Sequence, residues 1–151
     1  MKLKIGQSTL IKANIEASMW QDLLAFNRFL AFHYQTCHWL ASGQSAYAEH
    51  LLFEKIYKAV NEDTDGIAER SLGISEDSAV DLKICLSKMQ EHLEDLEGED
   101  FYSISLKLEE QMLDLLKQMD AVEDITIGTR DFINGLASEH EQNVYLLKLQ
   151  L

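Results

Sequence analysis

Four side chains in the first half of the chain have the chemistry of iron ligands. They are two histidines, His38 and His50, and two carboxylates, Asp65 and Glu69. The spacing of four residues between Asp65 and Glu69 places both carboxylates on one face of a helix. Imidazole and carboxylate groups without a nearby pair of thiols suit iron better than structural zinc. The sequence therefore contains a candidate ligand set for iron.

The spacing along the chain limits how these ligands can meet. His50 and Asp65 lie 15 residues apart on one expected helix, which separates them by about 22 Å at a rise of 1.5 Å per residue. Metal–ligand bonds of about 2 Å cannot bridge that gap, so one chain cannot close the site. The two side chains are only about 60° apart around the helix axis, so both can face the same antiparallel partner. A two-fold interface would place His50 of each chain beside Asp65 of the other and create two equivalent sites.

The elements that must position these residues are long helices. Apolar residues at helical spacing predict two helices joined by a tight turn, a long connection with its own helix, and two further helices. Gly43 and Gly73 are expected to end the first two helices, and Ser78 is a candidate cap for the helix in the connection. The expected ranges are 13–41, 45–72, 74–100 for the connection, 103–121, and 129 onwards. One long crossover is the connectivity of ferritin-like bundles, so we expect an all-α, ferritin-like four-helix bundle with an extra helix in the crossover, as a single domain over residues 1–151.

The composition supports this fold class and excludes others. The chain has no proline and seven glycines, 46% of its residues are hydrophobic, and its formal net charge is −13. The charge repels phosphate backbones and suits the collection of cations. No stretch approaches the roughly 20 apolar residues of a membrane-spanning helix, and no signal peptide is evident, so a cytoplasmic protein is expected. Cys37 and Cys85 are expected to be buried, reduced thiols.

Three short motifs resemble the signature of the Dps miniferritins. They read His38-Trp39-x-x-x-Gly43, His50-x-x-Phe53-Glu54 and Asp65-x-x-Ala68-Glu69-Arg70, and weaker similarity continues through Gly128-Thr129-x-Asp131, so that the resemblance covers most of the chain. The resemblance implies a ferroxidase centre at the subunit two-fold axis, with His38 and His50 donated by one chain and Asp65 and Glu69 by the other. It also implies that Glu54 helps to hold a second iron and that Trp39 lies beside the centre.

The same resemblance implies a function and an assembly. A hollow homo-oligomer, a dodecamer in this family, would oxidise Fe(II), typically with hydrogen peroxide, and store Fe(III) inside, which protects against oxidative damage. Zinc is expected to be able to take the place of iron in the di-iron centre. Glu62 is a candidate for seeding mineral, and Asp124 and Asp131 are candidates for a cation-conducting pore. A solvated helix end is an equally good interpretation of the last two.

Two other functions stay open at this point. The assembly could be catalytically silent, with a structural or DNA-organising role, or the shared site could handle zinc or manganese. Before the first helix the chain offers only Lys2, Lys4 and Lys12 as basic residues. Because so few contacts release few counter-ions, we expect no significant binding to DNA at moderate salt.

The remaining histidines are expected to have structural roles. His33 and His140 lie among apolar residues and are interpreted as satisfied core histidines, whereas His92 in an acidic run is expected to be exposed. No glutamate lies three residues before any of the five histidines, so the Glu-x-x-His motifs of a di-iron site inside one bundle are absent. Gly66 is expected to weaken the second helix between its two carboxylates.

Overall fold

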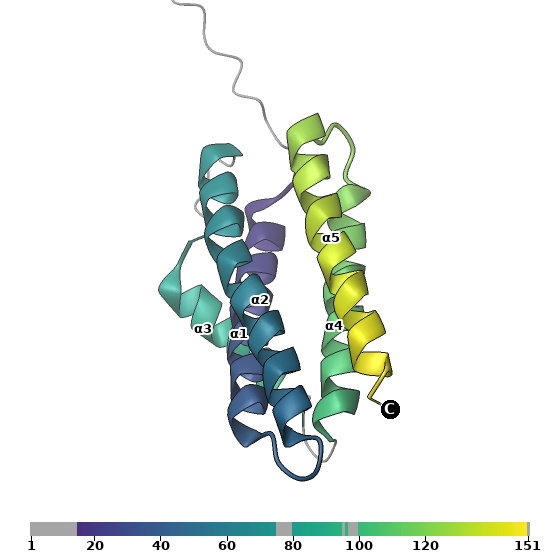
Figure 1. Cartoon of the computed structure of the whole chain (residues 1–151). Helices are drawn as coiled ribbons and strands as arrows, with labels where there is room; N and C mark the ends of the chain where they lie inside the picture. Colours follow the sequence, from purple (N-terminus) through teal and green to yellow (C-terminus); the bar gives the residue numbers. More distant parts are fainter. Residues whose placement is uncertain (1–14, 75–79, 95, 97–99, 151) are drawn as a thin grey trace, which may run out of the picture.

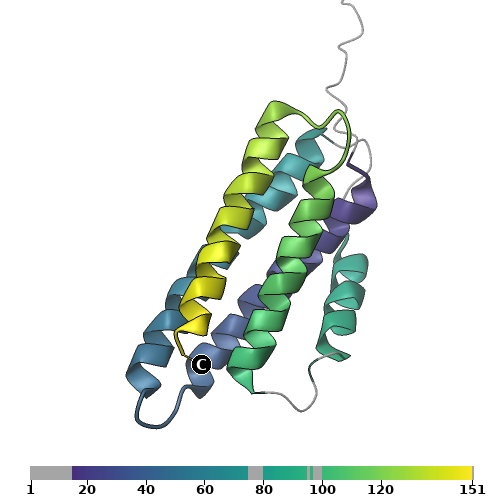
Figure 2. The ribbon, with the colours of Figure 1, turned by 90° about the vertical axis from the view of Figure 1, so that its right-hand side faces the viewer.

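The computed structural model describes residues 15–74, 80–94, 96 and 100–150, and this part of the chain is all-α. Its five helices are α1 (Ala17–Leu40), α2 (Ala46–Ile74), α3 (Leu82–Glu94), α4 (Phe101–Asp120) and α5 (Ile127–Lys148). Figures 1 and 2 show α1 and α2 as one antiparallel pair and α4 and α5 as another, packed together as a four-helix bundle. The expected all-α, ferritin-like bundle is confirmed.

The extra helix of the crossover lies outside the bundle. The helices α2 and α4 run in the same direction, so the connection between them has to travel the length of the bundle (Figure 2). Along this route α3 packs against α1, and none of its residues is fully buried. It therefore covers one side of α1 while presenting its own outer face to solvent.

The core is built from the apolar stripes of the four long helices. Each stripe follows the helical repeat, so that one face of every helix meets the others inside the bundle. Fully burying one such large side chain contributes about 1.5–3 kcal/mol. The largest fully buried side chains are Trp20, Tyr34, Phe53, Leu23, Leu30, Ile56, Ile67, Leu108, Met112, Leu116, Met119 and Ile133.

Two helices begin earlier than the sequence indicated, because polar side chains cap them. The carboxylate of Asp100 accepts hydrogen bonds from the backbone N–H groups of Tyr102 and Ser103, at 3.0 and 3.1 Å, so α4 begins at Phe101 rather than at residue 103. The hydroxyl of Thr126 accepts a hydrogen bond from the backbone N–H of Thr129 at 3.1 Å, so α5 begins at Ile127. Such caps satisfy N–H groups that have no partner inside the helix.

The glycines behave differently from one another. Gly43 has a φ of +88°, in the left-handed region that favours glycine, and it lies in the turn after α1 as expected. The prediction that Gly73 ends the second helix was wrong, because α2 continues through Ile74. A Cβ at Gly66 would lie 3.2 Å from the ring of Phe132, so this glycine allows α5 to pack closely against α2. Ser78, the candidate cap, lies outside the described residues.

Two of the three structural histidines and one of the two cysteines lie where they were expected. His33 and His140 are buried, but the prediction of an exposed His92 was wrong. Its ring stacks on Phe26 with the centroids 4.2 Å apart, because it lies on the face of α3 that meets α1. Both cysteines are free thiols; Cys37 is buried as expected, whereas Cys85 is only half-buried.

None of the helices in the described part of the chain is long and apolar enough to cross a membrane.

Candidate metal centre

The two histidines of the candidate centre lie side by side at one end of the bundle. His38 is in the last turn of α1 and His50 is near the start of α2, and the short turn between the helices brings them together. Their rings are stacked, with centroids 3.7 Å apart and planes inclined by 26°. The antiparallel helix pair therefore positions two imidazoles as one unit.

A reciprocal pair of hydrogen bonds fixes the two rings. The Nδ1 atom of His38 lies 2.9 Å from the backbone carbonyl oxygen of His50, and Nδ1 of His50 lies 2.9 Å from the carbonyl oxygen of His38. Because a carbonyl oxygen can only accept, each Nδ1 must carry the proton and donate it. The neutral rings then each keep a lone pair on Nε2. A hydrogen bond from the ring nitrogen that does not bind the metal orients the histidines of metal sites in this way.

A carboxylate and an ammonium group lie next to the imidazole pair. Glu54 follows His50 by one helical turn, and its carboxylate accepts a hydrogen bond from the ammonium group of Lys58. This bond and the charge of Lys58 hold the pKa of Glu54 below its usual value, and the two histidines add smaller effects in the same direction. Glu54 is thus within electrostatic reach of both imidazoles, and Lys58 would compete with a metal for it.

The two remaining predicted ligands are not at this end of the helix. Asp65 and Glu69 are exposed on α2, 15 and 19 residues beyond His50. Since α2 is continuous across this range, the separation of about 22 Å between His50 and Asp65 applies. Within the described ranges, no three His, Cys, Asp or Glu side chains are grouped so that they could hold a metal ion. The chain brings His38 and His50 together, with Glu54 one helical turn after His50, but it does not bring Asp65 and Glu69 to them. The ligand roles of these residues stay predictions.

Large apolar side chains are exposed around both halves of the predicted centre. At the histidine end the exposed residues are Phe32, Trp39, Leu40, Tyr47 and Leu51, with 62% of Trp39 accessible. At the other end, Asp65 borders a cleft between α2 and α3 that is also lined by Leu82 and Leu86, both more than half exposed. Exposed apolar surface of this extent marks sites of association.

The candidate mineral and pore residues lie elsewhere on the surface. Glu62 is exposed on α2 beside Asp63, whose pKa is raised to about 6 by burial and then by the charge of Glu139. Asp124 lies in the turn between α4 and α5 with a φ of +57°, and Asp131 is exposed near the start of α5. Their suggested roles stay predictions.

A buried polar network, which the sequence did not lead us to expect, lies in the middle of the bundle. The carboxylate of Glu109 on α4 is fully buried and accepts hydrogen bonds from the Tyr34 hydroxyl, from Nδ1 of His140 at 2.6 Å and from the Asn143 amide at 3.3 Å. Burial and the neighbouring carboxylate raise the pKa of Tyr34 well above its usual value. The sequence contains a signal for this network, because Glu109 lies three residues before Met112 and therefore on the inward, apolar face of its helix.

Comparisons with known proteins give relatives of modest sequence identity and close structural matches. No protein-family model matches the chain. It is 27% identical to an uncharacterised low temperature-induced protein of Nostoc sp. and to its homologue in Anabaena variabilis, over 97% of this chain and 85% of each relative.

The structural matches are to Dps proteins. Dps from Thermosynechococcus elongatus matches with a TM-score of 0.76 and 23% identity over 87% of each chain. DpsC from Streptomyces coelicolor matches with a TM-score of 0.78 and 22% identity, over 89% of this chain and 81% of that one. Dps from Mycobacterium smegmatis matches with a TM-score of 0.77 and 15% identity, over 100% and 94%. The chain therefore has the ferritin-like fold of the Dps proteins.

Proposed function

We propose that the protein is an iron-storing ferroxidase. It binds Fe(II) at centres shared between two copies of the chain, oxidises it with hydrogen peroxide, and holds the Fe(III) inside a hollow homo-oligomer. The observation that carries the proposal is the stacked pair of His38 and His50, in which each Nδ1 donates a hydrogen bond to a backbone carbonyl oxygen. Both Nε2 atoms are thereby available to a metal.

The second copy supplies the carboxylates that the imidazole pair lacks. A two-fold axis perpendicular to α2 would bring His50 of one chain to Asp65 of the other, with the axis passing near Tyr57 and Lys58, midway between them. The exposed apolar side chains at both ends of the predicted centre favour such self-association. The family resemblance and the Dps fold support a dodecamer as the final assembly.

The ligand set matches the proposed chemistry. Carboxylates and neutral imidazoles bind Fe(II) as hard and borderline ligands and leave coordination positions open for the oxidant. Two Fe(II) ions give one electron each to hydrogen peroxide, and with two protons the products are two Fe(III) ions and two water molecules. Because both electrons reach the same peroxide, no hydroxyl radical is released.

Iron oxidation by designed variants tests the proposal. Fe(II) is added anaerobically, then hydrogen peroxide, and the absorbance of Fe(III) is followed. The double variants His38→Ala with His50→Ala, and Asp65→Asn with Glu69→Gln, should each oxidise iron at least about tenfold more slowly, as expected for loss of metal ligands. The control variants His92→Gln and Glu110→Gln remove a histidine and an exposed carboxylate outside the centre and should keep the wild-type rate.

The alternatives give different results in the same assay. A wild-type protein that oxidises iron no faster than its double variants would contradict the proposal and favour a catalytically silent assembly. If manganese is the natural cargo, it should bind more tightly than Fe(II) in direct competition, against the usual order of these ions. If zinc is the natural cargo, the wild-type protein should bind zinc at the shared site but oxidise iron no faster than its double variants. A gel shift at physiological salt should detect no complex with DNA, and a retained complex would favour a DNA-organising role.

A further inference from the structure

A second polar pocket lies between α2 and α5, separate from the proposed ferroxidase centre. It has a volume of about 290 Å³. Its charged and polar lining includes Lys55, Glu62 and Asp63 from α2 and Glu139, His140 and Asn143 from α5. Three carboxylates and one ammonium group face this space, so the pocket carries net negative charge. The proposed function does not use it.

The imidazole at its base is oriented as a ligand. His140 is only 2% exposed, and its Nδ1 atom lies 2.6 Å from the buried carboxylate of Glu109. A carboxylate oxygen accepts hydrogen bonds, and this carboxylate also accepts them from Tyr34 and Asn143. The ring therefore donates its Nδ1 proton to Glu109 and keeps a lone pair on Nε2. The side chain of His140 lines the pocket.

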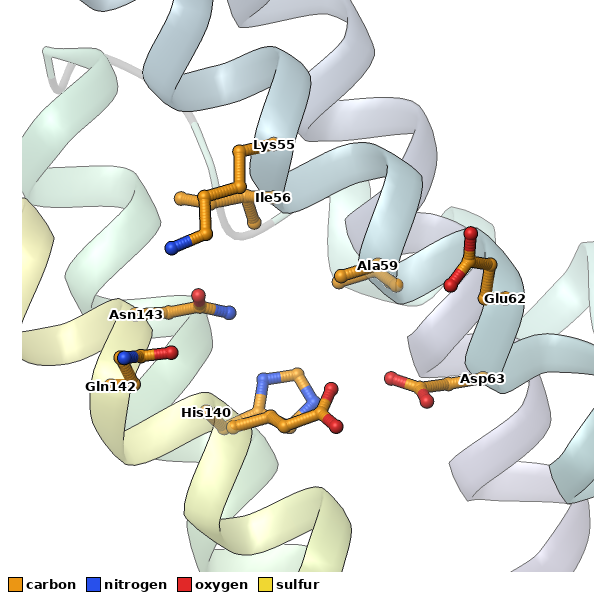
Figure 3. A pocket seen from close by; sticks show the side chains of 10 residues that line it. Lys55, Ile56, Ala59, Glu62, Asp63, His140, Gln142 and Asn143 are labelled. Atoms are coloured by element: carbon orange, nitrogen blue, oxygen red, sulfur yellow. The ribbon is translucent and has the colours of Figure 1, made fainter.

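Carboxylate oxygens come from both helices that line the pocket, from Asp63 on α2 and from Glu139 on α5. Figure 3 shows the Asp63 carboxylate on α2 directed across the pocket towards His140 on α5. Glu139 is exposed and free to change its rotamer, whereas Asp63 is half-buried. An imidazole nitrogen held by a buried carboxylate, with acidic oxygens beside it, is the pattern of a histidine that binds a transition metal.

We propose that this pocket binds one hydrated divalent transition-metal cation per chain, with Nε2 of His140 as the nitrogen ligand and Asp63 and Glu139 as oxygen donors. In the described part of the chain no three such side chains are grouped to hold a metal. The carboxylates therefore close on the cation when it binds, and water completes its coordination. The site belongs to a single chain and needs no second copy.

Zinc titration of the full chain tests this proposal independently of the shared centre. The background variant carries His50→Ala and Asp65→Asn, which remove ligands of the proposed ferroxidase centre and leave the pocket intact. Calorimetry with zinc(II) should still detect one bound equivalent per chain. X-ray absorption at the zinc edge should show one imidazole ligand with oxygen ligands around it.

Variants of the pocket identify the site. Adding Asp63→Asn and Glu139→Gln to the background should weaken zinc binding at least about tenfold, whereas adding Glu110→Gln should change nothing. These substitutions leave the buried contact between His140 and Glu109 untouched, so they test the site without removing a buried partner. Loss of all zinc binding in the background variant would overturn the proposal, and so would undiminished binding in the Asp63→Asn, Glu139→Gln variant.

Discussion

The pair of His38 and His50 and the single residue His140 each donate a hydrogen bond from Nδ1, but the pair lies at the exposed end of the bundle and His140 is buried inside it. In the pair of His38 and His50, each Nδ1 donates to a backbone carbonyl at the open end of the bundle. In His140, Nδ1 donates to the buried carboxylate of Glu109. The first arrangement holds two imidazoles at the exposed end of the bundle, where the proposed function needs them, whereas the second belongs to a network that ties α1, α4 and α5 together. If the proposed function is correct, activity should depend on the surface pair and stability on the interior network.

The largest expected effect concerns the interior network. Replacing Glu109 by Ala leaves the Tyr34 hydroxyl, His140 and the Asn143 amide without their shared acceptor inside the bundle. The free energy of unfolding should fall by about 3–5 kcal/mol, as for other broken buried pairs. Urea denaturation measures this loss. A loss below about 1 kcal/mol would mean that the network does not hold the bundle together.

The pH dependence of stability should come from a buried histidine. Burial lowers the pKa of His33 to about 4, below its usual value of about 6.5. Between these values the unfolded chain binds a proton that the folded chain does not, so acidification favours unfolding. The cost should grow from zero above about pH 6.5 to about 3 kcal/mol near pH 4.

Substitution separates this effect from the titration of the carboxylates. The His33→Gln variant keeps a polar side chain near Ser105, to which His33 is hydrogen-bonded at 2.9 Å. Its unfolding free energy should depend less steeply on pH between 6.5 and 4 than that of the wild type. Equal slopes in urea denaturation series would contradict the assignment to His33.

The surface pair should contribute little to stability. Replacing His38 and His50 by Ala removes two hydrogen bonds whose carbonyl acceptors lie at the exposed end of the bundle. Because water can replace the imidazole donors, the free energy of unfolding of the metal-free protein should change by about 1 kcal/mol or less. The same urea series measures this change. A decrease in the free energy of unfolding as large as that expected for Glu109→Ala would show that the surface pair and the interior network do not differ in their contribution to stability.

The smallest expected effect concerns the ion pair beside the surface histidines. The hydrogen bond and charge of Lys58 lower the pKa of Glu54. In Lys58→Met the pKa of Glu54 should rise, and because its carboxylate has no competing ammonium group, Fe(II) should bind a few-fold more tightly. Carboxyl NMR titration measures the pKa, and Lys107→Met on α4 is a matched control. An unchanged Glu54 pKa would show that the ion pair does not form in solution.

Much of the fold follows from periodicity. The four long helices and the helix in the crossover repeat apolar residues every three or four positions, and the chain lacks proline altogether. The errors lie at positions where one side chain decides the outcome. Asp100 and Thr126 cap the last two helices and move their starts, and Gly73 lies inside α2, which continues through Ile74.

The site was predictable only in part. Spacing along one helix shows that His50 and Asp65 cannot meet within a chain, and this holds because α2 is continuous. The reciprocal bonds of His38 and His50 depend on the geometry of the turn between two helices, which no local pattern specifies. The stacking of His92 on Phe26 likewise arises from tertiary packing, which overrides the acidity of its neighbours.

The central claim is that each centre takes its histidines from one chain and its acids from another, and complementation tests it most directly. One variant carries His38→Ala with His50→Ala, and the other carries Asp65→Asn with Glu69→Gln. Each alone should be nearly inactive. After unfolding and joint refolding in equal amounts, half of the two-fold pairs are mixed and hold one intact centre of two, so iron oxidation should recover to about a quarter of the wild-type rate. If the ligands belonged to a single chain, the mixture would stay as inactive as its parents, and that result would contradict the account.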